Sequence, residues 1–255
     1  MRIPAWPSML SGAIIFSLAA SPVAGFFEAF GQLAEQLKAI EQSAPSDLNT
    51  VLTEQDAGAG VRFNDVKADD WFNRYVSPVA RWGIVSGYKD AEGKSTGVFG
   101  PGNTVTVAEI LKMALRAAQV DEATCTGTST TLSGMSQAET HWAKAFVICA
   151  REKNVRLLRS NPDLNRPALR AEVLSVIFDA FGDDVPPLFS PFKDTVGHPL
   201  ESDVAYGAAL RMVSGDKDGS GKPKNTFRPD AAINRAEASK IIYERLRVEV
   251  MGDAT

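Results

Sequence analysis

The sequence contains few of the residues that carry most catalytic and metal chemistry. Its 255 residues include two histidines, His141 and His198, and two cysteines. The histidines lack the spacing of metal ligands, and no Ser–His–Asp grouping is suggested by their neighbours. We therefore expect a protein that is not an enzyme and that uses no metal and no cofactor.

A strong charge of one sign is also absent. The chain has 27 lysines and arginines against 31 acidic residues, which gives a net charge of −4. A mildly acidic chain offers no broad basic surface, so nucleic acid is not an expected partner. The longest apolar run, residues 9–20, is shorter than the roughly 20 residues that a membrane-spanning helix needs.

The N-terminus has the pattern of a secretory signal peptide. Arg2 precedes the apolar run, and the small residues Val23 and Gly25 follow it. This pattern predicts that residues 1–25 are a signal peptide that is removed on export. An uncleaved anchor is the alternative, because phenylalanines just after the run extend its apolar character.

Residues 26–60 are interpreted as an amphipathic helix followed by a linker. Apolar residues recur at helical spacing in residues 26–42, which predicts an amphipathic helix. This helix either packs on the rest of the chain, mediates self-association or the binding of a surface protein partner, or is a solvated spacer. Residues 43–60 contain proline and glycine and few large apolar residues, as a linker does.

The two cysteines, Cys125 and Cys149, lie 24 residues apart. An even number of cysteines in an exported chain favours a disulfide. The bridge would join a Thr/Ser/Gly-rich connector to an apolar helix face. Two unpaired thiols are the alternative.

The most informative feature is a short phrase that occurs three times. Asn234 followed by Glu237 has the pattern of a capping box, in which two side chains satisfy N–H groups at a helix start. The same phrase places Glu109 and Glu172 upstream. Successive glutamates are 63 and 65 residues apart, so the chain reads as three copies of one unit.

A second phrase repeats ahead of the first. The Phe-x-Asp step at Phe63 recurs at Phe192, and segment 83–88 resembles segment 211–215. In the middle unit only Trp142 and its neighbours match, so this unit is degenerate. The predicted units are residues 61–120, 121–185 and 186–248. Each is expected to form a helix, a long loop and a second helix, and to share a core with its neighbours because it cannot bury its apolar face alone.

The order F-x-D-V, Trp, G-I-x-S-G-Y, a Gly/Asp-rich turn, F-x-P and T/N-R-A-E resembles the S-layer homology (SLH) domain, which is usually found as three tandem copies. The resemblance covers residues 61–247. It implies a mainly all-α fold, in which three helix–loop–helix SLH repeats form a pseudo-threefold bundle with ligand grooves between the lobes.

The resemblance also implies a function. SLH domains anchor proteins at the bacterial cell surface by binding an anionic, often pyruvylated, secondary cell-wall polysaccharide non-covalently. The corresponding arginines here are Arg170 and Arg235, at the exposed first turn of a predicted helix. A guanidinium can hold a carboxylate with two hydrogen bonds. The alternative is an arginine that is solvated or paired with a nearby acid.

The first unit departs from the family pattern, because Val107 stands where the arginine is expected. We therefore predict two competent binding sites or fewer. The other candidate ligand contacts are Trp82, Gly87, Tyr88 and Gly215. Trp71 and Trp142 fall at helical spacing, and we predict that they are core residues.

The acidic residues of the repeated phrases have structural interpretations. The three glutamates are expected to cap helix starts, although Leu169 cannot complete the box in the middle unit. Residues 216–221 resemble the first half of a calcium loop, but Phe227 replaces the acid expected at the twelfth position. An ordinary Asx/Gly turn is favoured there.

Two functions follow from these observations. The first is a secreted cell-envelope module, located at the cell surface or cell wall of a bacterium, that binds anionic wall polysaccharide. The second is a structural or protein–protein interaction module in which polymer binding has been lost, as Val107 and the degenerate middle unit suggest.

Overall fold

The computed structural model describes residues 63–127, 132 and 134–252. The expected signal peptide, the 26–42 helix and the linker lie outside these residues. Within them the protein is mainly helical and has isolated β-bridges but no strands. The described helices include none that is long and apolar enough to cross a membrane. The all-α fold class predicted from the sequence is confirmed.

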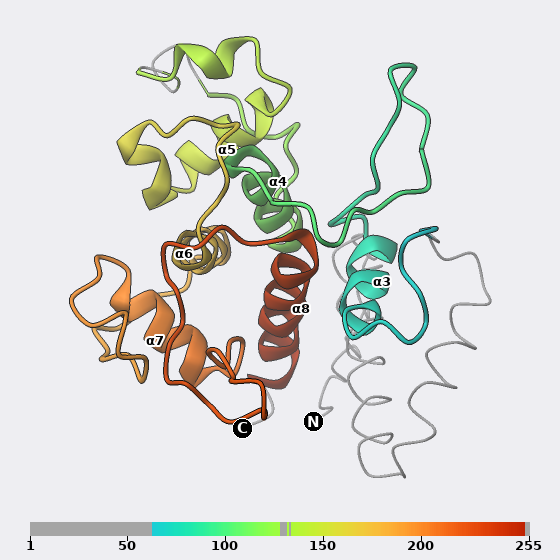
Figure 1. Ribbon diagram of the computed structural model, residues 1–255. Helices are drawn as coiled ribbons and strands as arrows, with labels where there is room; N and C mark the ends of the chain where they lie inside the picture. Colours follow the sequence, from blue (N-terminus) through green and yellow to red (C-terminus); the bar gives the residue numbers. More distant parts are fainter. Residues whose placement is uncertain (1–62, 128–131, 133, 253–255) are drawn as a thin grey trace, which may run out of the picture.

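Three helices form the centre of the molecule and three surround them (Figure 1). The central helices are α4 (Val107–Ala117), α6 (Arg170–Phe181) and α8 (Arg235–Gly252). The outer helices are α3 (Asn73–Arg81), α5 (Lys144–Glu152) and α7 (Glu201–Ala209). Two 3-10 helices, η1 (Ser136–Glu139) and η2 (Arg156–Ser160), flank α5 in the chain. This is the expected pattern of an outer and an inner helix in each unit.

The capping phrases begin the central helices as the sequence predicts. Thr106 and Glu109 form a complete capping box at the start of α4. Asn234 and Glu237 form another at the start of α8. Leu169 has no side-chain acceptor, so only the carboxylate of Glu172 contributes at α6, by accepting from the Leu169 N–H.

The starts of the central helices are joined in a ring of backbone hydrogen bonds. The N–H of Val105 donates to the carbonyl of Ile233, that of Ile233 to Ala168, and that of Ala168 back to Val105. The three N···O distances are 3.0, 3.2 and 2.8 Å. All three residues are buried. Each unit therefore contacts both others at this point, and we call these hydrogen bonds the central ring.

Two further sets of hydrogen bonds extend the central ring into the first helical turns. N–H groups in the first turn have no partner within their own helix. Here the next unit supplies the acceptors, in the pairs Val107–Arg166, Arg170–Ala231 and Arg235–Asn103, and then Ala108–Leu164, Ala171–Pro229 and Ala236–Pro101. The N–H groups at each helix start thus find their acceptors in another unit. These hydrogen bonds join the three units into one compact structure.

Each outer helix packs on the central helix of the preceding unit. Helix α5 packs on α4 and α7 packs on α6, while α3 packs on α8 at the other end of the chain (Figure 1). Tyr75 of α3 meets Tyr243 of α8 edge-on, with ring centroids 5.5 Å apart. The first and last units are therefore in contact.

The prediction that Trp71 and Trp142 are core residues is wrong. Their exposed fractions are 56% and 57%. Both tryptophans precede the first residue of their helix, α3 or α5. The helical spacing therefore does not extend to them, and their rings lie outside the buried helix face.

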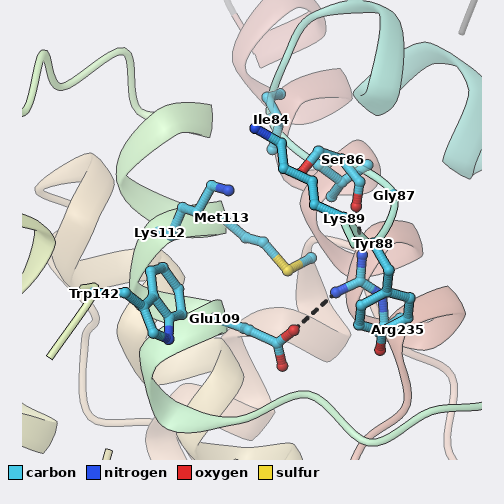
Figure 2. Close-up of a pocket in the computed structure, with 11 residues that line it drawn as sticks. Ile84, Ser86, Gly87, Tyr88, Lys89, Glu109, Lys112, Met113, Trp142 and Arg235 are labelled. Carbon is cyan, nitrogen blue, oxygen red and sulfur yellow. Dashed lines mark hydrogen bonds and ion pairs between the residues drawn. The ribbon is translucent and has the colours of Figure 1, made fainter. Parts of the chain in front are cut away.

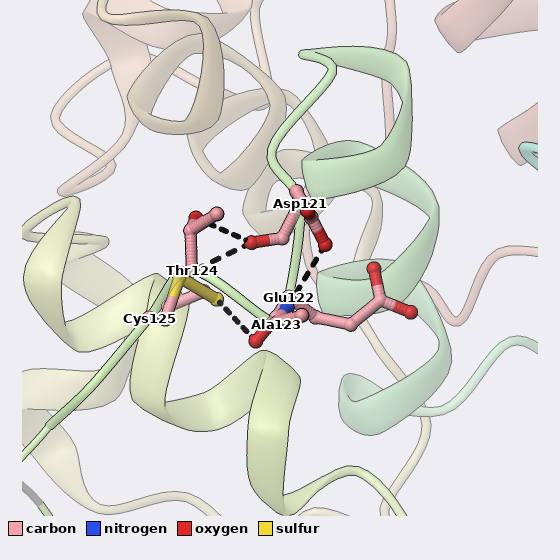
Figure 3. Close-up of a disulfide and its surroundings, with 6 residues drawn as sticks. Asp121, Glu122, Ala123, Thr124 and Cys125 are labelled. Atoms are coloured by element: carbon pink, nitrogen blue, oxygen red, sulfur yellow. Dashed lines mark hydrogen bonds between the residues drawn. A yellow bond between two sulfur atoms is a disulfide. The ribbon is translucent and has the colours of Figure 1, made fainter.

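The predicted disulfide between Cys125 and Cys149 is present (Figure 3). Cys149 is buried in α5, and Cys125 lies in the connector that follows α4. The connector turn is held by Asp121, whose side chain accepts from the N–H of Ala123. The bridge therefore fixes α5 to the chain that leaves α4.

Removal of the disulfide is expected to destabilise the fold. The double substitution Cys125→Ser/Cys149→Ser should lower the free energy of unfolding by about 3 kcal/mol, the chain-entropy value for a loop of this size. Guanidinium denaturation followed by circular dichroism measures the change. Adding a reductant to the double variant should have no further effect. An unchanged denaturation midpoint would show that packing alone holds the connector.

Candidate functional site

A cleft lies where the loop after α3 meets α4 and the start of α5. Its volume is about 640 Å³. The lining residues are Ile84, Val85, Ser86, Gly87, Tyr88, Lys89, Glu109, Lys112, Met113, Trp142 and Arg235. They come from all three units, since Trp142 precedes α5 and Arg235 begins α8 (Figure 2). We call this cleft the first groove.

Arg235 is almost fully engaged by the protein. Its side chain is only 8% exposed. Its Nε donates to the carbonyl of Phe99 at 2.9 Å and its Nη2 to that of Ser86 at 2.7 Å, while Nη1 pairs with Glu109 at 3.0 Å. The expectation of an exposed arginine is wrong, because its carbonyl and carboxylate partners come from the first unit.

Arg170 occupies the equivalent position between the second and third units. Its side chain is 11% exposed, and its Nη1 lies 3.3 Å from a carboxylate oxygen of Glu237. Burial lowers the pKa of the guanidinium, and the charge of Glu237 acts in the opposite direction. The arginine of each phrase therefore pairs with the capping glutamate of another unit, which gives this glutamate two structural tasks.

Two lysines line the first groove, the exposed Lys89 and Lys112, which lies beside Trp142. Lys112 is the more informative of the two. It is half-buried, and no ion pair to it occurs among the described residues. Its ammonium lies 6.0 Å from the ring centroid of the exposed Trp142. Burial lowers the pKa of Lys112, and the nearby cations Arg116 and Arg235 lower it further. An anion in the groove would relieve this unfavourable charge balance.

The opposite wall of the first groove is the segment that contains Gly87 and Tyr88, as expected for ligand contacts. The Tyr88 ring lies over the Arg235 guanidinium, 4.9 Å from it. A Cβ atom on Gly87 would lie 2.7 Å from the Val98 carbonyl oxygen and 2.8 Å from the Phe63 ring. Glycine is therefore required for the close packing of this wall.

The same set of residues recurs where α8 meets α3. Arg170 pairs with Glu237, as Arg235 pairs with Glu109. Lys240 takes the place of Lys112, and its ammonium lies 5.9 Å from the Tyr75 ring centroid. The exposed Trp71 takes the place of Trp142. By analogy with the first groove, we call the set of residues Trp71, Arg170, Asp216, Glu237 and Lys240 the second groove.

The third equivalent position, between α6 and α7, differs. Val107 replaces the arginine, Ser175 replaces the lysine and Pro199 replaces the tryptophan. Arg156 fills this interface by pairing with Asp179 at 2.8 Å and with the buried Asp203 at 2.5 Å. We call this cluster the third interface. Its one guanidinium is paired with two carboxylates, so this cluster offers no free cation to a ligand.

The remaining sequence candidates lie elsewhere. Trp82 stacks on Tyr243 with a centroid distance of 6.3 Å and does not line the first groove. Gly215 is the counterpart of Gly87 and has a positive φ of 61°. In residues 216–221, Asp218 accepts from the N–H groups of Ser220 and Lys222, as in an Asx turn. No metal-binding group of acids, cysteines or histidines occurs among the described residues.

Sequence reasoning missed the two lysines. A signal for them exists, because a Glu-x-x-Lys step occurs at Glu109–Lys112 and at Glu237–Lys240 but not after Glu172. Residues three apart on a helix lie on the same face. Each lysine therefore lies one turn beyond a capping glutamate, on the face that the neighbouring outer helix borders.

Comparison with known proteins finds two matching segments and one related enzyme. The model of the S-layer homology domain matches residues 62–110 and 191–239, so SLH sequence occurs in the first and third units. The chain is also 30% identical over 196 residues to an amylopullulanase from Thermoanaerobacterium thermosulfurigenes. This alignment covers 71% of the chain and 9% of that relative, so the chain spans a small part of its length.

Arg235 is expected to be a residue on which folding depends. Arg235→Ala should lower the free energy of unfolding by about 3 kcal/mol, because it leaves Glu109 and two carbonyls without their partner. Thermal and chemical denaturation measure the loss. Arg170→Ala should cost less, since its ion pair is longer and it makes fewer hydrogen bonds. Equal stability of Arg235→Ala and the unaltered protein would contradict the structural role.

Proposed function

We propose that this protein is a non-catalytic cell-surface module that binds an anionic bacterial wall polysaccharide in its first and second grooves. The observation that carries the proposal is the half-buried, unpaired Lys112, which faces an exposed tryptophan inside a cleft. The SLH matches support a role at the cell wall. Bacterial secretion, with residues 1–25 as a signal peptide, belongs to the same proposal.

The chemistry of the first groove suits an acidic sugar. Lys112 supplies a positive charge for a carboxylate, such as that of a pyruvylated sugar. Trp142 presents its ring to solvent and offers a flat surface for the apolar face of the sugar ring. Arg235 holds the opposite wall in place and adds positive potential without being the main contact.

Two grooves on one rigid body give a higher affinity for a polymer than a single groove does. Once one groove holds a polysaccharide segment, the other meets a high local concentration of the same chain. The central ring keeps the grooves at a fixed spacing. Weak individual sites would therefore give firm, reversible anchoring.

We further propose that residues 121–185 are a third, degenerate SLH repeat between repeats at 61–120 and 186–248. The participation of Ala168 in the central ring supports this, because it takes the place that Val105 and Ile233 take in the other units. The third interface has lost the binding residues but has kept the fold. Segment 26–60 is proposed as a helix and linker that mediates self-association or contact with a surface protein.

The second candidate function is a structural or protein–protein interaction module. The third interface favours it, since one of the three positions has exchanged its binding residues for internal ion pairs. In this case the first and second grooves would be remnants. Binding to wall material distinguishes the two functions.

The substitution Lys112→Gln tests the first function. It removes the charge but keeps a polar side chain of similar length. Its affinity for purified wall sacculi should fall by roughly tenfold, the loss expected for one hydrogen bond to a charged group. Cosedimentation at two salt concentrations measures the affinity, and high salt should weaken the unaltered protein more than the variant.

Lys144→Gln is the matched control. Lys144 lies on α5 outside the groove and pairs with the exposed Glu139. The affinity of the Lys144→Gln variant for sacculi should equal that of the unaltered protein. If Lys112→Gln binds sacculi as the unaltered protein does, Lys112 is not the anion contact. If the unaltered protein binds no wall material, the interaction-module function is favoured.

A further inference from the structure

The first and second grooves differ in the pair of residues that stand beside the largely buried arginine. In the first groove, Tyr88 stands at one end of the loop and Gly100 at the other end. In the second groove, the equivalent residues are Asp216 and Arg228. An aromatic side chain beside a glycine is thus replaced by an acid beside a cation. The two pairs therefore make different contacts with the neighbouring arginine.

In the first groove, the pair covers Arg235. Tyr88 and Phe99 both contact its guanidinium, with centroid distances of 4.9 and 4.7 Å. Gly100 makes room for the tyrosine, because a Cβ atom there would lie 2.6 Å from the Tyr88 ring. All three guanidinium nitrogens of Arg235 have protein partners. An anion in this groove therefore meets the lysines Lys112 and Lys89 rather than a free donor of Arg235.

In the second groove, Arg170 is less completely engaged. Phe227 contacts its guanidinium at 4.7 Å and accepts from Nε through its carbonyl. Nη1 reaches Glu237, whereas Nη2 has no hydrogen-bond partner among the described residues. No tyrosine covers this arginine, since Asp216 occupies that position. Arg170 thus keeps a donor for a ligand.

Arg228 stands beside this donor in an unusual conformation. Its φ is +58°, in the left-handed region that favours glycine. Its side chain is more than half exposed. Its Nε donates to the two carboxylate oxygens of Asp216 at 3.0 and 2.9 Å, and its Nη2 lies 2.9 Å from one of them. Arg228 directly follows Phe227, whose carbonyl accepts from Nε of Arg170 at 2.9 Å, so the backbone of Arg228 lies beside the Arg170 guanidinium. Glycine would fit this backbone conformation without strain, so the Arg228 side chain can be removed without disturbing the turn.

We propose that Arg228 binds the anionic group of the ligand together with Arg170 in the second groove, with Asp216 as the residue that positions Arg228. This inference rests on the proposed function. It adds that the two grooves hold the anion with different side chains. Both grooves have a lysine near a tryptophan, Lys112 with Trp142 and Lys240 with Trp71. The second presents guanidinium groups, which can hold a carboxylate through two parallel hydrogen bonds.

The test measures ligand binding at both grooves in one sample. The indole N–H signals of Trp71 and Trp142 report on the second and first grooves in a titration of the ¹⁵N-labelled full chain. The probe is methyl mannoside carrying a 4,6-pyruvate ketal, and unsubstituted methyl mannoside is the neutral control. Arg228→Gly should weaken probe binding at Trp71 by about tenfold and leave binding at Trp142 unchanged.

The fold of the variant should be preserved. Glycine suits the left-handed conformation, so the melting temperature of Arg228→Gly should be unchanged or higher. The matched control is Arg211→Gly, which removes an exposed arginine with a φ of +60° at the end of α7. This control should bind the probe at both grooves as the unaltered protein does.

The outcomes separate this inference from the proposed function. Unchanged binding at Trp71 in Arg228→Gly overturns the role of Arg228 and leaves the proposed function standing. Equal weakening at both tryptophans, or the same effect in Arg211→Gly, overturns it as well, because the effect would then be one of overall charge. If the charged probe binds neither groove of the unaltered protein, both proposals fail.

Discussion

The central ring of Val105, Ala168 and Ile233 is the constraint on which the rest of the structure depends. Each of these residues belongs to a different unit, and each both donates and accepts one backbone hydrogen bond. A ring of this kind forms only when all three units are present. It explains how short helices, none of which can bury its apolar face alone, share one core. It also brings α3 against α8, so the first unit is completed by the last.

The grooves follow from this closure. Because the helix starts meet at the ring, the arginine of one unit reaches the capping glutamate of another, as in the pair Arg235–Glu109. That pair fixes the wall against which a ligand would lie, and the lysine one turn further along supplies the free charge. The third interface shows the same geometry with internal ion pairs. The residues that hold the fold together and the residues proposed to bind a ligand are thus adjacent on the same helical turns.

Much of the fold could be predicted from the sequence, because the repeats carry local signals. The capping phrases marked the helix starts, and the two cysteines indicated the bridge that forms. The burial of Arg235 could not be predicted, since its partners Phe99 and Ser86 lie more than a hundred residues away in the chain. The exposure of Trp142 depends on one detail, namely that the helix begins two residues after it.

Native-state hydrogen exchange tests the central claim most directly. If the units form one closed body, the amide protons of Val105, Ala168 and Ile233 should exchange only when the whole fold opens. Their three exchange free energies should then be equal to one another and to the free energy of unfolding measured with denaturant. Exchange of the Val105 amide at a clearly lower free energy than the Ala168 amide would contradict the account. It would mean that the first unit opens independently and that the chain behaves as a string of separate units.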